Sequence, residues 1–391
     1  MGKIKKFFIL LITCIYLMFF TTGCWNSREL NAIAIVLGTG IDKSPEQGKI
    51  QITAQIVKPE SLRSSGSNKG GGSSNDKSFW NASYDGETVF SSIRGLTHVS
   101  PRKLFWPHNQ VIIFGKSVAF SGIKEYIDFF LRDHEPRISA YILVSDTTAR
   151  DVFEVTPKLE KVTSMNINSL MKNQSSTSQT VVTKFKEFLT DYMSKTKVCI
   201  APIIRITGEG EGKTISVSGL AMFKDLKMTG QLDENETRGV LWATGKVKSG
   251  IITVDIAENN KKVSFETIKA RSKITPEIKD NTIIMKININ AEGNIGENTG
   301  NLDITKLEVI NALEKAVTNT IKNEIMSAVK KAKEFDTDVF GFGNLLYEKY
   351  PEQWLHIGND WDVIFKNVQT EISVNTNIIL EGKINKPASM H

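Results

Sequence analysis

The sequence predicts a multidomain α+β protein with three domains, in which antiparallel or mixed sheets pack against helices. Two patterns in the 391-residue chain support this fold class. Apolar and polar residues alternate over 283–289 and over 368–380, which is typical of strands with one face in water. Between them, apolar residues recur every three or four positions and indicate a long helix with one buried face. These residues are Leu307, Ile310, Leu313, Val317, Ile321 and Ile325.

The chain begins with the pattern of a secretory signal peptide. Three lysines precede an apolar run at 7–20, which is shorter than the roughly 20 residues of a membrane-spanning helix. Thr-Thr-Gly then leads to Cys24, and this spacing resembles the lipobox of bacterial lipoproteins, although Thr21 stands where an aliphatic residue is favoured. We expect cleavage of residues 1–23 and a diacylglyceryl group on the thiol of Cys24, whose amino group can also be acylated. The alternatives are an ordinary signal peptide and an uncleaved anchor.

Charge and cysteine content argue against several functions. Removal of residues 1–23 takes three lysines away and lowers the formal net charge from +6 to +3. So small a charge favours neither a nucleic-acid partner nor electrostatic binding to a membrane. With Cys14 removed and Cys24 lipidated, Cys199 has no disulfide partner. Its apolar neighbours indicate a buried, inert thiol rather than a nucleophile.

The first domain is expected to span residues 24–157. Strand patterns at 32–43 and 49–58 flank a turn and predict a β-hairpin with one face in water. The glycine- and serine-rich stretch at 59–78 is expected to be a mobile loop inside this domain. Helices and strands then alternate, which favours a sheet covered by helices. The helices are predicted at 86–96, 122–133 and 147–155, the last with a threonine cap, and the strands at 109–115 and 137–146.

Two further regions complete the chain. Residues 158–197 are expected to form a helical connector or a small middle domain, because two helical patterns flank a polar run. Residues 198–391 hold the alternating strands and the long helix, for which Thr305 and Glu308 have the spacing of a capping box. The pattern predicts a half-exposed antiparallel sheet with the long helix on its dry face.

The sequence contains none of the common catalytic or cofactor-binding motifs. There is no Walker loop, nucleophile elbow, paired CxxC or HExxH. Asp133, His134 and Glu135 are neighbours in the sequence and cannot all converge on one metal ion. The two glycines of Phe-Gly-Phe-Gly-Asn at 340–344 lack the context of a phosphate-binding loop and indicate a sharp turn. We therefore expect a protein without enzymatic activity, cofactor or metal.

Aromatic residues concentrate near the C-terminus. Trp354 and Trp361 lie close in sequence to Tyr347 and Tyr350. They predict either core packing beneath the last strand or a surface for a ligand or partner.

The stretch GCWNSRELNAIAIVLGTGIDK resembles the mature start of the Ger(x)C family, the lipoprotein C subunits of bacterial spore germinant receptors. In that family a lipid-bearing Cys, a Trp and Arg-Glu-Leu precede a strand that ends in Gly-x-Gly-Ile-Asp. Stretches at 104–137, 218–246 and 338–365 continue the likeness in the family's order. The matching residues of the first stretch are Cys24, Trp25, Arg28, Glu29, Leu30, Gly38, Gly40, Ile41 and Asp42, while Asn26 departs from the usual Asp.

The resemblance implies a non-enzymatic, largely α+β lipoprotein on the outer face of the cell membrane, which in the spore is the inner membrane. It would work in a complex with a polytopic A subunit and a transporter-like B subunit that responds to nutrient germinants. The sequence leaves open whether this subunit binds germinant directly. A solute-binding lipoprotein of a transporter is the alternative, but it would normally show two lobes with parallel sheets. An envelope hydrolase would need a convergent acid, base or nucleophile set.

The tether between the expected lipid and the first strand is short. About seven residues, 25–31, separate Cys24 from that strand, and they reach at most about 25 Å when extended. The first domain is therefore expected to lie close to the bilayer. Trp25 and Leu30 are candidates for contact with the membrane or a partner, unless they cap the core of the first domain.

Overall fold

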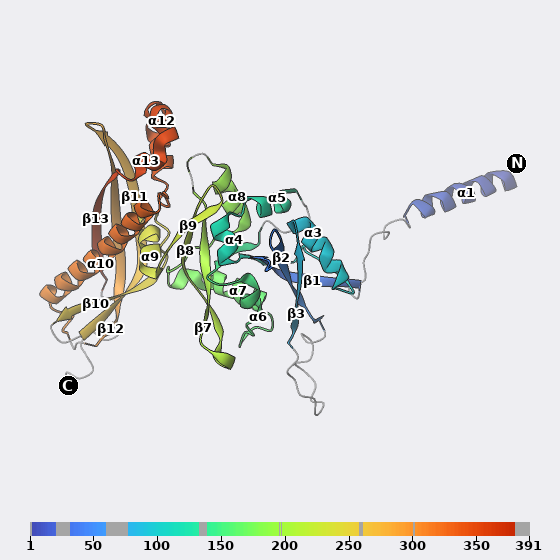
Figure 1. Ribbon diagram of the computed structural model, residues 1–391, viewed down its shortest axis with the longest axis horizontal. Helices are drawn as coiled ribbons and strands as arrows, with labels where there is room; N and C mark the ends of the chain where they lie inside the picture. Colours follow the sequence, from blue (N-terminus) through green and yellow to red (C-terminus); the bar gives the residue numbers. More distant parts are fainter. Residues whose placement is uncertain are drawn as a thin grey trace.

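The computed structural model describes residues 2–20, 32–59, 77–132, 139–194, 196, 198–257, 261–299 and 302–379. Two sheets lie side by side along the long axis of the molecule, with the N-terminal half at the right of Figure 1 and the C-terminal half at the left. Among these described residues, one sheet has nine strands and the other has four, and helices pack on both. This arrangement confirms the predicted α+β fold class.

The N-terminal helix α1 (Gly2–Phe20) includes the lysine-rich start of the chain and the apolar run at 7–20. Within the described parts of the chain, no helix is long and apolar enough to span a membrane.

The nine-stranded sheet is mixed. Its order is β3-β2-β1-β5-β6-β7-β8-β9, with β4 paired to the start of β1. The strands β1, β5, β6 and β7 run parallel, whereas a meander of antiparallel strands forms each edge. The strands are β1 (Ile33–Lys43), β2 (Ile50–Val57), β3 (Phe79–Gly86), β4 (Lys103–Phe105), β5 (Val111–Phe114), β6 (Tyr141–Ser145), β7 (Ile200–Thr207), β8 (Thr214–Lys224) and β9 (Lys227–Leu232).

The stretch predicted to be a mobile loop, 59–78, connects two neighbouring strands of this sheet. Val57 pairs with Phe79, and the Lys58 N–H donates to the Ser78 carbonyl at 2.9 Å. Residues 60–76 lie outside the described residues, so their mobility stays a prediction.

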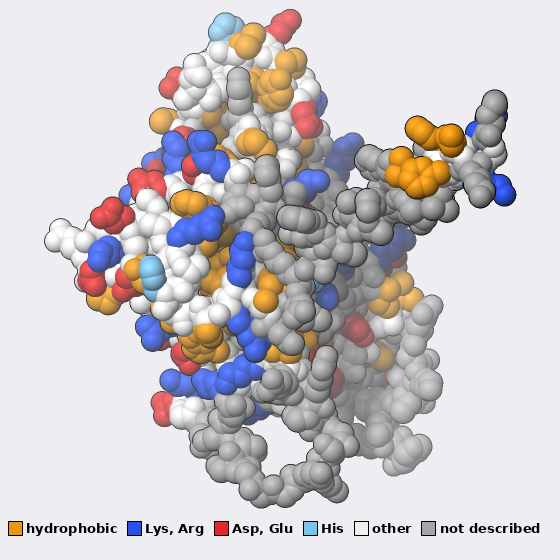
Figure 2. Space-filling view, turned by 90° about the vertical axis from the view of Figure 1, so that its right-hand side faces the viewer, with side chains coloured by type: hydrophobic (Ala, Val, Ile, Leu, Met, Phe, Trp, Pro, Cys, Tyr) orange, Lys and Arg blue, Asp and Glu red, His pale blue; other side chains and the backbone are white. Residues whose placement is uncertain are grey.

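Helices cover both faces of the nine-stranded sheet. Apolar side chains of α3, α4, α5 and α8 share one core with the sheet, and those of α6 and α7 share another on the opposite face. When the molecule is viewed from the N-terminal end, Lys and Arg side chains gather near the middle of the surface (Figure 2). The helices are α3 (Val89–Gly95), η2 (Leu96–His98), α4 (Lys116–Ser121), α5 (Lys124–Arg132), α6 (Ala149–Glu154), α7 (Thr163–Asn173), η3 (Gln174–Ser176) and α8 (Phe185–Met193).

The prediction that one face of the β1–β2 hairpin lies in water is wrong. Thr53 and Gln55 on β2 are fully buried, because α6 and α7 cover that face. The Gln55 amide oxygen accepts from the N–H and hydroxyl of Ser164, both at 2.7 Å. Its NH₂ group donates to the Phe153 carbonyl at 3.2 Å and to the Asn81 side chain at 3.0 Å. These polar side chains tolerate burial because they satisfy one another.

The four-stranded sheet has the order β10-β11-β12-β13. Its first three strands are antiparallel, as predicted, whereas β13 runs parallel to β12. A long helical crossover causes this difference, since it returns the chain to the starting end of β12. The strands are β10 (Gly250–Ala257), β11 (Lys261–Lys279), β12 (Thr282–Asn298) and β13 (Gln369–Ile378), and the crossover begins with α10 (Leu307–Glu334).

The long helix α10 packs on one face of this sheet, as the apolar stripe predicted. The predicted capping box of Thr305 and Glu308 is absent. The helix begins after Lys306, which makes no side-chain cap hydrogen bond, and Thr305 donates instead to the Asp303 carboxylate at 2.5 and 3.0 Å. The stripe is buried from its third member onward, at Leu313, Val317, Ile321 and Ile325.

The β8–β9 hairpin joins the two halves, because its two faces belong to different cores. Ala221 and Phe223 pack in the core beneath α3, α4, α5 and α8. Leu220 and Met222, from the same strand, pack in the core of the four-stranded sheet. The expected boundary at residue 198 falls just before β7 of the nine-stranded sheet, and the three domain limits stay predictions.

A buried ion pair fixes α10 against α9 (Glu234–Ala243), the helix that follows the hairpin. Arg238 and Glu324 are each 7% exposed, and the Arg238 guanidinium donates to both oxygens of the Glu324 carboxylate. Trp242 Nε1 donates to the same carboxylate at 3.2 Å, and the third guanidinium nitrogen of Arg238 donates to the Ile251 carbonyl at 3.0 Å. The backbones are close as well, since a Cβ at Gly239 would lie 2.3 Å from the Glu324 carbonyl oxygen.

Replacing Glu324 with glutamine should destabilise the fold strongly. The Arg238 charge would remain buried without its counter-ion, which typically costs about 3–5 kcal/mol of unfolding free energy. Urea unfolding of the purified protein measures this loss. Glu334→Gln is the matched control on the same helix, because its pair with Lys331 is exposed and should contribute no more than about 1 kcal/mol. Equal losses in the two variants would show that the buried pair contributes no more to the unfolding free energy than the exposed pair does.

Candidate functional site

Several residues singled out by the sequence lie outside the described residues. Cys24, Trp25 and Leu30 fall within 21–31, and Asp133, His134 and Glu135 fall within 133–138. The described chain resumes at Ala32, directly before β1. Among the described residues, no group of three or more His, Cys, Asp or Glu side chains could hold a metal ion.

The Gly-Thr-Gly-Ile-Asp motif of β1 is the place where α6 and α7 rest on the sheet. A Cβ at Gly38 would lie 2.2 Å from Ser164 Oγ and 2.7 Å from the Phe153 ring. A Cβ at Gly40 would lie 2.9 Å from the Ala149 side chain. Only glycine leaves room for the two helices at this distance, so both glycines have a packing role.

Asp42 completes the motif by holding the start of α6. Its two carboxylate oxygens accept from the N–H groups of Ala149 and Arg150, at 2.8 and 3.0 Å. Burial raises the pKa of Asp42 above its usual range, and these two hydrogen bonds act in the opposite direction. At the same helix end, Thr148 caps α6 as predicted, accepting from the Asp151 N–H at 3.0 Å.

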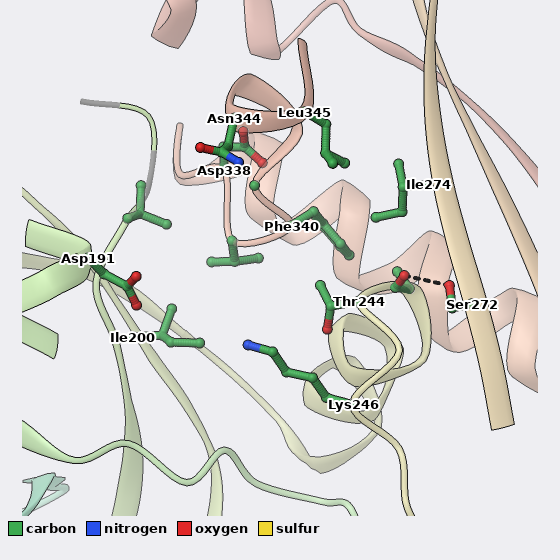
Figure 3. Close-up of a pocket in the computed structure, with 14 residues that line it drawn as sticks. Asp191, Ile200, Thr244, Lys246, Ser272, Ile274, Asp338, Phe340, Asn344 and Leu345 are labelled. Carbon is green, nitrogen blue, oxygen red and sulfur yellow. Dashed lines mark hydrogen bonds between the residues drawn. The ribbon is translucent and has the colours of Figure 1, made fainter. Parts of the chain in front are cut away.

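A groove runs between the two halves and is a candidate site among the described residues. It contains a pocket of about 320 Å³ bounded by the end of α8, the start of β7, the turn after α9, β11 and residues 338–345. Figure 3 shows the Lys246 side chain reaching across this pocket toward Ile200 and Asp191, with Phe340 between it and Asn344. A second pocket of about 240 Å³ adjoins it and shares Val198 and Asp338.

Asp338 organises the C-terminal side of the groove. It is 5% exposed, and its carboxylate accepts from the N–H groups of Phe342 and Gly343, at 3.0 and 2.7 Å, and from Trp361 Nε1 at 3.1 Å. Burial raises the pKa of Asp338 above its usual range, and these donors oppose the rise. Gly341, at φ +72°, supplies the left-handed residue of the predicted sharp turn. The carboxylate therefore joins the turn to the helices α11 (Phe342–Lys349) and α13 (Trp361–Phe365).

Cys199 lines the second pocket and is inert, as the sequence predicted. It is 4% exposed, its thiol donates to the Phe188 carbonyl at 3.3 Å, and burial raises its pKa to about 12. The thiolate form needed for nucleophilic chemistry is therefore very scarce at neutral pH. The groove presents the exposed ammonium group of Lys246 together with the apolar side chains of Ile200 and Phe340. Sequence reasoning did not find this set, because its members come from segments far apart in the chain.

The aromatic concentration at the C-terminus divides between core and surface. Trp361 is 8% exposed and packs in the core of the C-terminal half, with its ring 5.4 Å from that of Trp354. Tyr347 is 49% exposed. Leu355 on α12 (Pro351–Ile357) and Val363 on α13 are 79% and 66% exposed. Trp361 thus packs in the core, whereas Tyr347 and the neighbouring apolar residues Leu355 and Val363 face solvent.

Both halves of the chain match known protein families. Residues 26–206 match the model described as spore germination protein N-terminal domain, and residues 218–382 match spore germination B3/GerAC like, C-terminal. The chain belongs to the Ger(x)C family. The two matches divide at the β7–β8 turn, inside the nine-stranded sheet.

Individual relatives are similar in sequence to this Ger(x)C protein over nearly their whole length. Spore germination protein YndF of Bacillus subtilis is 26% identical, over 98% of this chain and 99% of the relative. Spore germination protein KC of the same organism is 24% identical over 93% of each chain. The crystal structure of the GerBC protein has the same fold, with a TM-score of 0.58, 18% identity and coverage of 88% of this chain and 97% of that one.

Replacing Gly38 with alanine should weaken the packing of α6 and α7 on β1. The added methyl group would meet Ser164 and Phe153, and overpacking of this kind costs about 1–3 kcal/mol. Urea unfolding measures the change in unfolding free energy. Gly212→Ala is the control, because a Cβ there meets nothing within 4 Å. A Gly38→Ala protein as stable as this control would refute the packing role.

Proposed function

We propose that this chain is the non-enzymatic, lipid-anchored C subunit of a nutrient germinant receptor and is required for triggering spore germination. The observation that carries this proposal is the match to germination proteins over both halves of the chain. Two further relatives are spore germination proteins A3 and B3 of Bacillus subtilis, 26% and 22% identical over 90% and 97% of this chain. A full-length likeness supports a shared role better than a match to one domain would.

The anchor in this proposal is Cys24. A thioether-linked diacylglycerol places two acyl chains in the bilayer, and two chains hold a protein stably where one gives only marginal binding. The protein would then lie on the outer face of the cell membrane, and in the spore on the inner membrane. Its partners would be the A and B membrane subunits of the receptor.

A solute-binding lipoprotein of a transporter is the alternative function. Such proteins normally close two separate lobes with parallel sheets around a solute. Here the second sheet is mainly antiparallel, and the β8–β9 hairpin gives one strand to both cores. This construction favours a fixed subunit over a hinged capture protein.

Replacing Cys24 with alanine should abolish anchoring. Most of the protein should move from the membrane to the soluble fraction or keep its signal peptide, and germination in response to nutrients should fall with it. Membrane fractionation measures the anchoring, and the response of spores to nutrients measures germination. Affinity purification from the membrane fraction then identifies co-purifying A and B subunits.

Cys14→Ala is the matched control for this experiment. It removes the other cysteine of the N-terminal region but leaves the lipobox pattern unchanged, so anchoring and partners should be retained. Mass spectrometry of a mature chain that starts at an unmodified Cys24 would contradict the anchoring. An anchored chain that purifies without membrane subunits would contradict the receptor role.

A further inference from the structure

The chain enters the nine-stranded sheet beside β4, which lies at the start of β1. Ile33 pairs with Lys103, and Ile35 pairs with Phe105, in parallel register. The surface next to this point comes from α3, from β4 and from the segment 99–102 that leads into β4. We call it the basic-aromatic face and define it by Phe90, Arg94, Val99, Arg102 and Lys103.

The apolar members of the basic-aromatic face are unusually open to solvent. Phe90 is 52% exposed and Val99 is 43% exposed. The Phe90 ring lies 6.1 Å from the half-buried ring of Phe129 on α5, so a packed aromatic pair supports it from one side. A hollow of about 60 Å³ lies beside it, lined by Phe90, Ile93, Arg94, Thr97, Lys103, Leu104 and Trp106. An exposed Phe ring beside a hollow lined by both apolar and basic side chains is suited to the boundary between lipid headgroups and acyl chains.

The remaining members of the face are cations. Arg94, Arg102 and Lys103 are exposed, and none of them forms a salt bridge among the described residues. The Arg94 guanidinium lies 5.1 Å from the Phe90 ring centroid, which holds charge and ring together. Figure 2 looks onto this end of the molecule and shows Lys and Arg side chains gathered near its middle.

Anchoring changes what a cluster of this size can do. The small net charge of the mature chain does not favour membrane binding by free protein. A tether that reaches at most about 25 Å, however, keeps the domain at a high effective concentration beside the bilayer. Weak attraction between three cations and anionic headgroups is then enough to select which face turns toward the lipid.

We propose that the basic-aromatic face lies on the membrane surface and contacts anionic lipid headgroups, with Phe90 at headgroup level. This inference rests on the anchoring of Cys24 proposed above. In this orientation β1 and β4 stand next to the bilayer. The helices α11 to α13, at the opposite end of the molecule in Figure 1, point away from it toward solvent or a partner.

Depth-dependent quenching on vesicles tests this orientation. The lipidated protein is reconstituted alone in vesicles of phosphatidylcholine and phosphatidylglycerol. A nitrobenzoxadiazole probe is attached to Val99→Cys, which keeps Phe90 and the cations, or to the control Leu355→Cys on α12. The buried thiol of Cys199 should not react with the reagent. A headgroup-level spin-labelled lipid should quench the probe at residue 99 and leave the probe at residue 355 unquenched.

Charge reversal shows whether headgroups cause the orientation. Arg94→Glu combined with Lys103→Glu should abolish the quenching at residue 99, as should vesicles of phosphatidylcholine alone. Lys273→Glu combined with Lys279→Glu is the matched control, since it makes the same change of charge on exposed positions of β11. Quenching should survive in this control.

Flotation of the vesicles separates the two proposals. Protein that floats with equal quenching at residues 99 and 355 would overturn the orientation while leaving the anchor intact. Protein that does not float would contradict the anchoring and, with it, this inference. Quenching that persists after Arg94→Glu with Lys103→Glu would overturn the role of the headgroups.

Discussion

The structure depends on one strand pair that serves two cores. The β8–β9 hairpin closes one edge of the nine-stranded sheet, and the side chains on its two faces pack into different halves of the molecule. Close packing then fixes the two halves relative to each other, because neither core can lose its contacts with the β8–β9 hairpin without opening a cavity. The groove between the halves is a consequence of that hairpin, with α8 and β7 on one side and the segment around Asp338 on the other.

The shared β8–β9 hairpin also relates the N-terminal end of the molecule, which we propose faces the membrane, to its far end. The expected tether enters at β1, where Gly38, Gly40 and Asp42 bring α6 and α7 onto the sheet. At the other end, the buried pair of Arg238 and Glu324 holds α9 against α10. A domain oriented on the bilayer would therefore place the exposed side chains of α11 to α13 at a defined height above it. In the receptor complex proposed above, such a constraint would present a partner with a surface that is already in position.

Local patterns predicted the elements, and long-range packing decided what the sequence could not show. Alternation and the three-to-four repeat depend on a few neighbouring residues, so the strand at 283–289 and the α10 stripe could be predicted. The burial of Gln55 depends on Ser164, over 100 residues away, and no local pattern reports that. A capping box was predicted at Thr305 because its spacing fits, but a nearby aspartate competes for the same donors. The groove could not be predicted, because its lining comes from five separate segments.

Hydrogen exchange of the Glu324→Gln protein tests most directly whether the β8–β9 hairpin is part of both cores. Peptides from residues 214–232 should exchange faster than in the wild type, together with those of α9 and α10. The hairpin is part of the core that this substitution weakens, and the exchange rate reports the stability of each cooperative unit. Faster exchange confined to residues 234–379, with unchanged protection at 214–232, would show that the hairpin belongs to the first half alone and that the two cores are independent.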